Sequence, residues 1–343
     1  MSFRSIALAA FLALGASLVS TSVQGQQPDT PIKVQTTLVS VPVIVSDRQG
    51  RYISGLKAAD FKLYQDRTEQ PIASFDAVEE PLNVALIIDT SHSTLPVLDD
   101  IKSAGVKFLK ELRPADRAMI VSVDYDVHVL SELTSDRKAL ENAVKRAKTG
   151  EQLGTVLRDA ISEVIERSLK RIDGRKAIIV LTDGKDVGSR IPEQVLLDEA
   201  AESGAMIYTV FFETGFLRRG WIDPLTFPRR RVWMGRDRFP PARPRRENQR
   251  SQRVESRNAE AKGFLTTLAD VSAGRFYSSD ASDFKKTFSL IAEELRHQYR
   301  LGFYPDATKA DGQRHSLRVQ VSTPDAVVRA RRSYQAARLT NGS

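Results

Sequence analysis

Three oxygen-bearing side chains alternate along one short stretch of the chain: Asp89, Ser91 and Ser93. An apolar run, residues 84–88, precedes them and predicts a buried strand, so the three side chains should lie on the loop at its carboxyl end. Open α/β sheets bind ligands at this edge, and several oxygen donors on one loop suit a hard divalent cation. The stretch therefore predicts one half of a cation site.

A second carboxylate, Asp183, follows a second apolar run, residues 177–181, and Gly184 comes directly after it. Because Gly184 lacks a side chain, it permits a tight turn beside the carboxylate. Gly154 and Thr155 lie between two predicted helices, where a loop could return the Thr155 hydroxyl to the same edge of the sheet. These residues are the predicted second half of the site.

Five positions in this order resemble the metal-ion-dependent adhesion site of the von Willebrand factor A (VWFA) domain, a D-x-S-x-S loop with a distant Thr and a distant Asp. The matching residues are Asp89, Ser91, Ser93, Thr155 and Asp183. The resemblance implies that the two serines and the threonine bind Mg²⁺ or Mn²⁺ directly, while the two aspartates act largely through water. It also implies that the last helix of the domain moves when the metal site is occupied.

Some neighbouring residues depart from the family pattern. His92 stands where the family often has Gly, and Leu153 with Gly154 replaces a pair of glycines. Neither change removes an oxygen ligand. The predicted partner-binding rim around the site consists of His92, Asp124, Asp126 and Gly184.

Residues 82–298 alternate strand and helix patterns, which predicts a doubly wound, mostly parallel α/β sheet. The resemblance implies six strands flanked by helices, in a VWFA or Rossmann-like arrangement. Towards the end of this region the periodicity predicts a helix over Glu260–Leu268 and a last helix over Phe284–Leu295.

The flanking segments, residues 31–80 and 299–335, repeat with period two, as in Val41 and Val43 or in Leu317 and Val319. Each segment has too few strands to bury both of its faces. We therefore expect them to pair into one small β-sandwich that carries the α/β domain as an insertion; two separate β modules are the alternative. These flanks also resemble a family of exported bacterial proteins related to the VWFA domain.

Residues 1–25 have the pattern of a secretory signal peptide. Arg4 precedes an uncharged, mostly apolar run, Ile6–Val19, and small and polar residues lead to a predicted cut before Gln26. The run is short for a membrane span, and no other stretch is long enough, so we expect an exported, periplasmic or secreted protein without a transmembrane segment after cleavage. An uncleaved anchor is the alternative. With no cysteine, the protein has no disulfide.

The formal charge of +8 comes from one segment, because Arg218–Arg257 contains thirteen Arg, no Lys and four acidic residues. Five prolines and few aliphatic residues between positions 216 and 257 predict a long, flexible loop. A solvated loop is the favoured interpretation, and an anionic surface or acidic partner comes second. No nucleic acid is expected, because an exported protein rarely meets it as a working ligand.

The sequence thus predicts an exported binding protein and not an enzyme. Its Mg²⁺ or Mn²⁺ site would bind an Asp or Glu carboxylate of a protein partner, in adhesion or assembly. The alternative is an empty or degenerate metal site, with the Arg-rich loop binding anionic surfaces or acidic partners. A further alternative is an ordinary loop capped by an aspartate, with a serine that caps the next helix. A metal-dependent hydrolase is disfavoured, because Asp89, Ser91 and His92 on one loop cannot easily adopt triad geometry, and there is no Gly-rich phosphate loop.

Overall fold

The structure, a computed structural model, describes residues 38–76, 80–214, 244–305 and 311–336 of the 343-residue chain. Its strands are β1 (Val39–Ser46), β2 (Phe61–Gln65), β3 (Thr68–Gln70), β4 (Ser74–Asp76), β5 (Leu82–Asp89), β6 (Arg117–Val123), β7 (Val127–Thr134), β8 (Arg175–Thr182), β9 (Met206–Phe211), β10 (Arg275–Ser278), β11 (Gln298–Phe303), β12 (Arg314–Val321), β13 (Val327–Ala330) and β14 (Ser333–Gln335).

The helices are α1 (Leu98–Glu111), α2 (Arg137–Arg146), α3 (Leu157–Glu163), α4 (Glu193–Glu202), α5 (Pro244–Val271) and α6 (Phe284–Arg296). Shorter helical turns are η1 (Ala58–Asp60), η2 (His92–Val97), η3 (Val164–Leu169) and η4 (Ala281–Asp283). The predicted signal peptide, residues 1–25, and residues 216–243 of the predicted basic loop lie outside the described residues.

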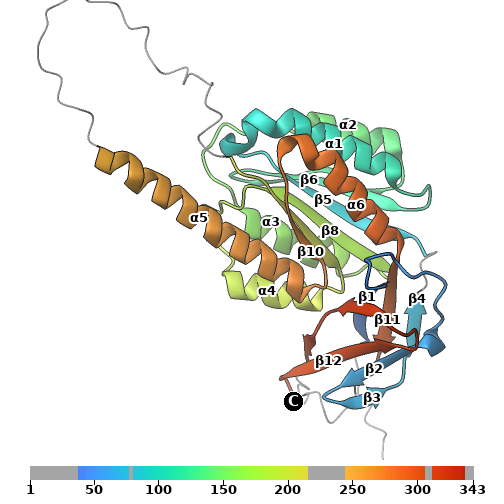
Figure 1. The fold of residues 1–343 in the computed structure, drawn as a ribbon. Helices are drawn as coiled ribbons and strands as arrows, with labels where there is room; N and C mark the ends of the chain where they lie inside the picture. Colours follow the sequence, from blue (N-terminus) through green and yellow to red (C-terminus); the bar gives the residue numbers. More distant parts are fainter. Residues whose placement is uncertain (1–37, 77–79, 215–243, 306–310, 337–343) are drawn as a thin grey trace, which may run out of the picture. The chain divides into compact units, whose positions relative to one another are not determined.

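One six-stranded sheet has the order β10-β9-β8-β5-β6-β7 (Figure 1). Its neighbouring strands are parallel except for β6 and β7, which pair antiparallel. Numbered along the chain from β5, the strands lie in the order 3-2-1-4-5-6, which is typical of a doubly wound sheet and reverses direction between β5 and β8. The predicted fold class is confirmed.

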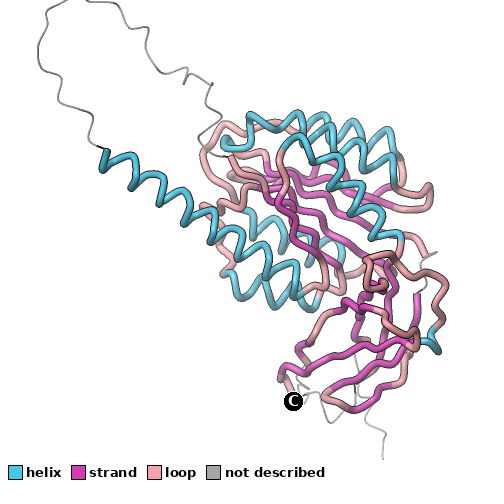
Figure 2. Tube along the Cα trace, viewed as in Figure 1, coloured by secondary structure: helices cyan, strands magenta, loops and turns pink. Residues whose placement is uncertain are grey.

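Helices cover both faces of this sheet (Figures 1 and 2). On one face α1, α2 and α6 share a core with alternate residues of β5, such as Val84 and Leu86. On the other face α3, α4 and α5 share a core with the residues between them, Ala85 and Ile87. Because both faces are buried, the central strands are continuous apolar runs without polar alternation.

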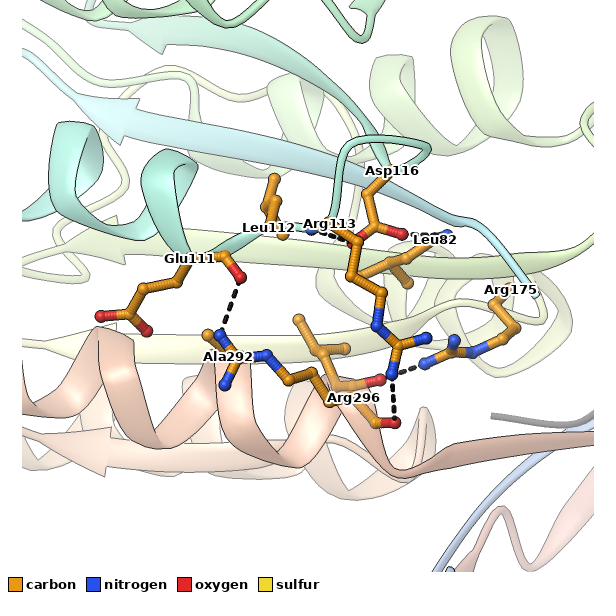
Figure 3. A pocket seen from close by; sticks show the side chains of 9 residues that line it. Leu82, Glu111, Leu112, Arg113, Asp116, Arg175, Ala292 and Arg296 are labelled. Atoms are coloured by element: carbon orange, nitrogen blue, oxygen red, sulfur yellow. Dashed lines mark hydrogen bonds between the residues drawn. The ribbon is translucent and has the colours of Figure 1, made fainter. Parts of the chain in front are cut away.

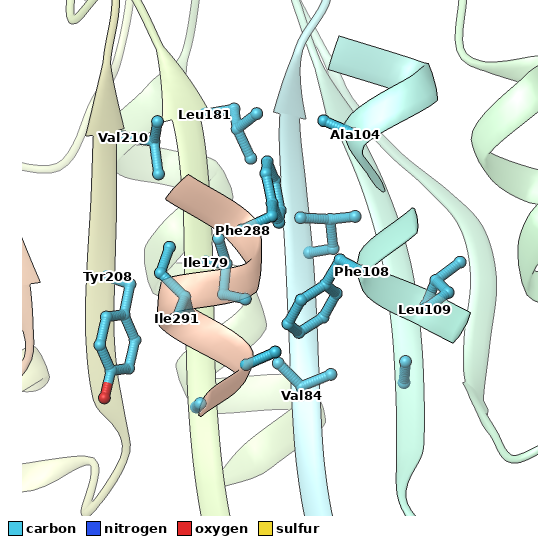
Figure 4. Close-up of a cluster of buried hydrophobic side chains, with 14 of the residues drawn as sticks. Val84, Ala104, Phe108, Leu109, Ile179, Leu181, Tyr208, Val210, Phe288 and Ile291 are labelled. Atoms are coloured by element: carbon cyan, nitrogen blue, oxygen red, sulfur yellow. The ribbon is translucent and has the colours of Figure 1, made fainter. Parts of the chain in front are cut away.

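Aromatic side chains hold α6 on the first of these cores (Figure 4). Phe108 of α1 and Phe288 of α6 lie with ring centroids 5.5 Å apart, and both side chains are fully buried. Burial of one such side chain stabilises the fold by roughly 1.5–3 kcal/mol. The helix that ends the α/β region is therefore packed firmly against the sheet.

The two flanking segments form two further sheets, ordered β13-β1-β11-β4 and β14-β12-β2-β3. In the first, β1 pairs antiparallel with β11, so that Val43 lies opposite Tyr299; in the second, β2 pairs with β12, and Leu63 lies opposite Val319. The inward side chains of both sheets form one core. The prediction that the N- and C-terminal segments build a common β module is confirmed, since each sheet takes strands from both segments.

A buried carboxylate, Glu294 of α6, connects the helix to this β module. The Glu294 side chain has no exposed surface; its Oε1 accepts a hydrogen bond from the Tyr208 hydroxyl at 2.7 Å and an ion-paired bond from Arg329 of β13. Oε2 lies 3.2 Å from both the Tyr52 hydroxyl and the Arg275 guanidinium. Burial and the charge of Glu294 raise the pKa of Tyr208, which keeps its hydroxyl protonated and able to donate.

A second polar cluster lies where strands β5, β6 and β8 begin (Figure 3). The Asp116 carboxylate accepts the backbone N–H groups of Leu82 at 2.9 Å and of Arg113 at 2.8 Å. The buried Arg175 guanidinium donates to the carbonyl of Leu295 at the end of α6. The cavity among these side chains measures about 10 Å³, so the cluster has no room for a ligand larger than one water.

The helix predicted over Glu260–Leu268 is much longer than expected, because α5 begins at Pro244. The prediction of a loop up to residue 257 is therefore wrong for residues 244–257. All five prolines of the segment lie at or before position 244, and proline is favoured at the first position of a helix. The Arg, Glu and Gln residues that follow are good helix formers. None of the described helices is both long enough and apolar enough to cross a membrane.

Glu294→Gln should lower the free energy of unfolding by roughly 3 kcal/mol, because it removes the negative charge that two arginines share in a buried site. Glu293→Gln is the matched control: Glu293 is half exposed and, among the described residues, forms ion pairs with its chain neighbours Arg296 and His297, so its loss should cost less than about 1 kcal/mol. Urea unfolding of both variants measures the difference. Equal effects would show that the buried cluster does not secure α6.

Candidate metal centre

The two predicted carboxylates lie at the ends of neighbouring strands. Asp89 is the last residue of β5, and Asp183 follows β8 directly. The two strands are parallel and in register, with Ile88 opposite Leu181. This is the position at which the strand order reverses, where doubly wound sheets bind their ligands. The fold therefore brings together two residues that lie far apart in the sequence.

Both carboxylates are withdrawn from solvent, since Asp89 is 0% exposed and Asp183 is 1% exposed. Asp89 Oδ1 accepts the backbone N–H of Ser91 at 2.9 Å, and Oδ2 accepts the Thr182 hydroxyl at 2.7 Å. Burial and, to a smaller extent, the nearby charge of Asp183 raise the pKa of Asp89 to about 6. Two buried carboxylates this close leave negative charge that a cation would neutralise.

Ser91 and Ser93 present their hydroxyls to each other, with the two Oγ atoms 3.1 Å apart. The loop that carries them turns into η2 and is held from within by Thr94, whose buried hydroxyl donates to the carbonyls of Asp89 at 3.0 Å and Ser91 at 2.8 Å. Thr90 fastens the other side of the loop, because its backbone N–H donates to Val123 of β6 at 2.8 Å. The hydroxyl pair is thus held by its own loop.

Thr155 is buried and lies beside the loop that follows Asp183. Its backbone N–H donates to the Val187 carbonyl at 3.3 Å, and its carbonyl accepts the Val187 N–H at 2.9 Å. The structure therefore places the predicted threonine next to the Asp183 loop. No hydrogen bond joins the Thr155 side chain to the other predicted ligands among the described residues, so its role as a ligand stays a prediction.

Two aspartates outside the predicted set tie these loops to α3. The Asp186 carboxylate accepts the backbone N–H of Arg158 at 2.9 Å, and the Asp159 carboxylate accepts the N–H groups of Arg190 and Ile191, each at 2.9 Å. Their signal in the sequence is weak, because isolated aspartates in loops are common. They act through other residues, by holding the loops that carry Thr155 and Asp183.

Lys185 is the most important residue that the sequence pattern did not identify. Its ammonium nitrogen lies 2.6 Å from Asp183 Oδ2 and 2.6 Å from the Thr214 hydroxyl, and that hydroxyl also contacts Asp183. The Lys185 side chain is only 30% exposed. The Asp183 carboxylate is thus already paired with a single positive charge, the Lys185 ammonium. A lysine two positions after the second aspartate was the available sequence signal.

The four predicted rim residues have different environments. His92 and Asp126 are exposed. Asp124 is buried, and its Oδ1 accepts the Asp126 N–H at 3.0 Å and lies 3.1 Å from His128 Nε2, so it closes the β6–β7 turn. Gly184 is partly buried with φ of +71°, beside Ala261 of α5. Contact of these residues with a partner stays a prediction.

The donor set fits a hard divalent cation. It offers two buried carboxylates and adjacent serine hydroxyls, which are the oxygen ligands that Mg²⁺ and Mn²⁺ prefer. Among the described residues there is no cluster of three or more His, Cys, Asp and Glu side chains, so a site of the zinc-enzyme type is not formed there. Asp89 bonds to Ser91 and Thr182, and His92 is exposed, so these residues do not form a catalytic triad.

Fold and site together define a doubly wound α/β domain with a candidate cation site at its topological switch point. Residues 84–185 match the family model of the von Willebrand factor type A domain, a range that contains all five predicted ligands. These residues of the chain therefore form a VWFA-type domain. The finer resemblance, to an exported bacterial family, stays a prediction.

Several solved structures are similar to part of this chain at low identity. The conserved hypothetical protein BatB from Bacteroides thetaiotaomicron is 20% identical, with a TM-score of 0.44 over 62% of this chain and 97% of that chain. The vWF domain of the type V pili tip protein Mfa5 from Porphyromonas gingivalis is 14% identical, with a TM-score of 0.43 over 62% and 94%.

Proximal thread matrix protein 1 from the mussel byssus, described with a zinc-occupied MIDAS motif, is 15% identical, with a TM-score of 0.46 over 65% of this chain and 47% of that chain. Likeness at this level concerns the fold and carries no conclusion about what this chain binds. No curated protein matches the sequence.

Gly184→Ala should lower the free energy of unfolding by roughly 1–3 kcal/mol, because the residue has φ of +71° and the new Cβ would lie 2.7 Å from the Cβ of Ala261. Gly263→Ala is the control: Gly263 is exposed within α5, and its Cβ would meet nothing within 4 Å. That variant should be more stable by roughly 0.5–1 kcal/mol, because alanine favours helix. Denaturant unfolding compares the two; an unchanged Gly184→Ala variant would contradict the tight packing of the Asp183 loop.

Proposed function

We propose that this protein binds another protein through a divalent cation, Mg²⁺ or Mn²⁺, held at the carboxyl ends of β5 and β8. The observation that supports this most strongly is the pair of buried carboxylates, Asp89 and Asp183, beside the facing hydroxyls of Ser91 and Ser93. Burying two like charges is unfavourable unless a cation compensates them.

In this proposal Ser91, Ser93 and Thr155 supply neutral oxygen ligands, and Asp89 and Asp183 supply charge, largely through water. The hydrogen bonds from Ser91 and Thr182 hold the Asp89 carboxylate in one orientation. A bound cation with mainly neutral direct ligands would be electrophilic and would accept a carboxylate oxygen from a partner. The partner would therefore contribute an Asp or a Glu.

Lys185 sets the charge of the site before any divalent ion binds. Its ammonium neutralises one of the two carboxylates, and its contact with Asp183 must weaken when a divalent cation takes that carboxylate. The free site should consequently have moderate affinity for divalent ions, because a competing cation belongs to the chain itself.

VWFA domains are in general protein-interaction modules, and we propose this role here, in adhesion or assembly, in place of enzymatic activity. Export from the cytosol stays a prediction that rests on residues 1–25. Binding of an anionic surface through the Arg-rich segment also stays a prediction. The described part of that segment is helical, and its exposed Arg253 and Arg257 alternate along the chain with the exposed Glu255 and Glu260. This mixed charge favours a solvated helix face.

Asp89→Ala should weaken Mg²⁺ or Mn²⁺ binding by roughly 10–100-fold, because it removes a charge that acts on the ion through water. Ser93→Ala should weaken binding as well, and it leaves the fold intact because the Ser93 hydroxyl bonds only to Ser91 among the described residues. Asp173→Ala is the control, since Asp173 is an exposed residue of the turn before β8, at the other end of the strand. Isothermal titration calorimetry measures each affinity. Equal binding by all four proteins, or none by any, would reject the metal site.

Lys185→Met should increase the affinity for Mg²⁺ by roughly tenfold, because it removes the positive charge that occupies Asp183. Lys170→Met is the control: Lys170 pairs with Glu166 on the surface of η3, and its removal should leave Mg²⁺ binding unchanged. The same calorimetric titration compares the two variants. Weaker binding by Lys185→Met would mean that the lysine supports the site and does not compete with the ion.

A further inference from the structure

Four large apolar side chains are exposed on the loops that form the candidate metal centre. Leu95 in the serine loop is 59% exposed, Tyr125 in the β6–β7 turn 47%, Leu153 ahead of Thr155 79%, and Val187 after Asp183 67%. Each of the loops that surround the site thus presents one such residue. Large apolar side chains of this kind are costly to leave in water unless they serve an interface.

Three of these residues lie on loops that contact one another. A Cβ atom at Gly154 would lie 3.1 Å from the Tyr125 ring and 3.2 Å from the carbonyl oxygen of Val187. Leu153 is the neighbour of Gly154 in the chain, and the next residue, Thr155, pairs with Val187. The loops that carry Tyr125, Leu153 and Val187 therefore meet on the side of the site where Thr155 lies. We call these three residues the apolar collar.

Packing within the protein does not explain the collar. Other exposed apolar residues of the described chain, such as Val195 on α4, Leu290 on α6 and Val327 on β13, lie singly on different elements. Scattered exposed residues of that kind are normal on protein surfaces, whereas a cluster around a polar site indicates binding. The backbone around the collar is also ordered by hydrogen bonds, because Val156 N–H donates to the Asp124 carbonyl at 2.9 Å.

We propose that the apolar collar selects the partner, and that the partner presents an Asp or Glu flanked by apolar side chains on a protein segment. This inference rests on the proposed function, which places a positive centre beside the collar. The divalent ion makes this centre charge-complementary to the acidic residue, whereas Lys185 alone only offsets the charge of Asp183. The apolar neighbours of the acidic residue cover the collar and exclude water from the ionic contact, which strengthens it.

The collar also restricts the kind of ligand. A polyanion or a peptide with only polar residues around its acid could reach the charged centre, but it would leave Tyr125, Leu153 and Val187 exposed. An apolar peptide without an acid would leave the charged centre unpaired and desolvated. Both features are needed together, so the surface discriminates between acidic partners that the metal alone would bind equally.

Two synthetic peptides test the proposal: one has a central Glu between Leu and Phe residues, and the other has the same Glu between Ser residues. Fluorescence anisotropy in saturating Mg²⁺ should show binding of the apolar-flanked peptide roughly tenfold tighter. Replacing Glu by Gln in that peptide should abolish binding. In the Tyr125→Ser/Leu153→Ser/Val187→Ser variant, the preference should fall to within about twofold.

The control variant is Val195→Ser/Leu290→Ser, which removes exposed apolar residues from α4 and α6 and should keep the full preference. Leu153→Ser alone, at the most exposed position, should reduce the preference in part without affecting the fold. Calorimetric Mg²⁺ titration of each variant separates the two claims. If Mg²⁺ binding is intact, three results would overturn the collar and leave the metal site standing. These are equal affinity for both peptides, no binding of either peptide, or a preference that survives in the triple variant. Absence of Mg²⁺ binding in the unmodified protein would overturn both.

Discussion

The repulsion between two buried carboxylates is the constraint on which the rest of the candidate site depends. Asp89 and Asp183 end neighbouring parallel strands with almost no exposure, so neither charge can be screened by solvent. The fold responds locally in several ways. Burial and the neighbouring charge raise the pKa of Asp89; Ser91 and Thr182 donate hydrogen bonds to it; and Lys185 pairs with Asp183. Negative charge still exceeds the single ammonium, and a divalent cation is the simplest chemical complement.

Hydrogen bonds to backbone groups help to hold the loops that deliver the other oxygens. The Asp186 carboxylate accepts a backbone N–H of α3, and the Asp159 carboxylate of α3 accepts a backbone N–H of the loop after β8. The Thr94 hydroxyl donates to a carbonyl of its own loop. Such contacts fix the backbone while they leave apolar side chains free to face solvent. This explains how Tyr125, Leu153 and Val187 remain exposed beside a polar centre. With the proposed divalent ion bound, this centre and its apolar collar would suit an acidic residue in an apolar setting.

The β module lies at the end of the six-stranded sheet opposite the candidate metal centre. It contacts α6, the last helix of the α/β domain. Glu294 on α6 bonds to Tyr208 of the α/β sheet and to Arg329 of the β module, and Arg175 contacts the end of the same helix. A displacement of α6 would have to break these buried polar contacts. β11 follows α6 directly in the chain and pairs with β1 of the β module. The helix is therefore held by the α/β sheet and also by the β module.

Much of this protein could be predicted from its sequence, for identifiable reasons. Apolar runs between helical patterns predicted the doubly wound sheet, and period-two segments too short to fold alone predicted the shared β module. The spacing of Asp89, Ser91 and Ser93 predicted a loop of oxygen donors, because local chemistry decides what one loop can offer. The composition does not reveal the extent of α5, because the prolines up to position 244 indicate a loop and the helix formers come after them. Only the tertiary structure decided which distant residues meet: the pairing of Lys185 with Asp183, the support from Asp186 and Asp159, and the convergence of Tyr125, Leu153 and Val187. The physical reason is that strand order and register determine which loops become neighbours, and neither is encoded in the residues of any single loop.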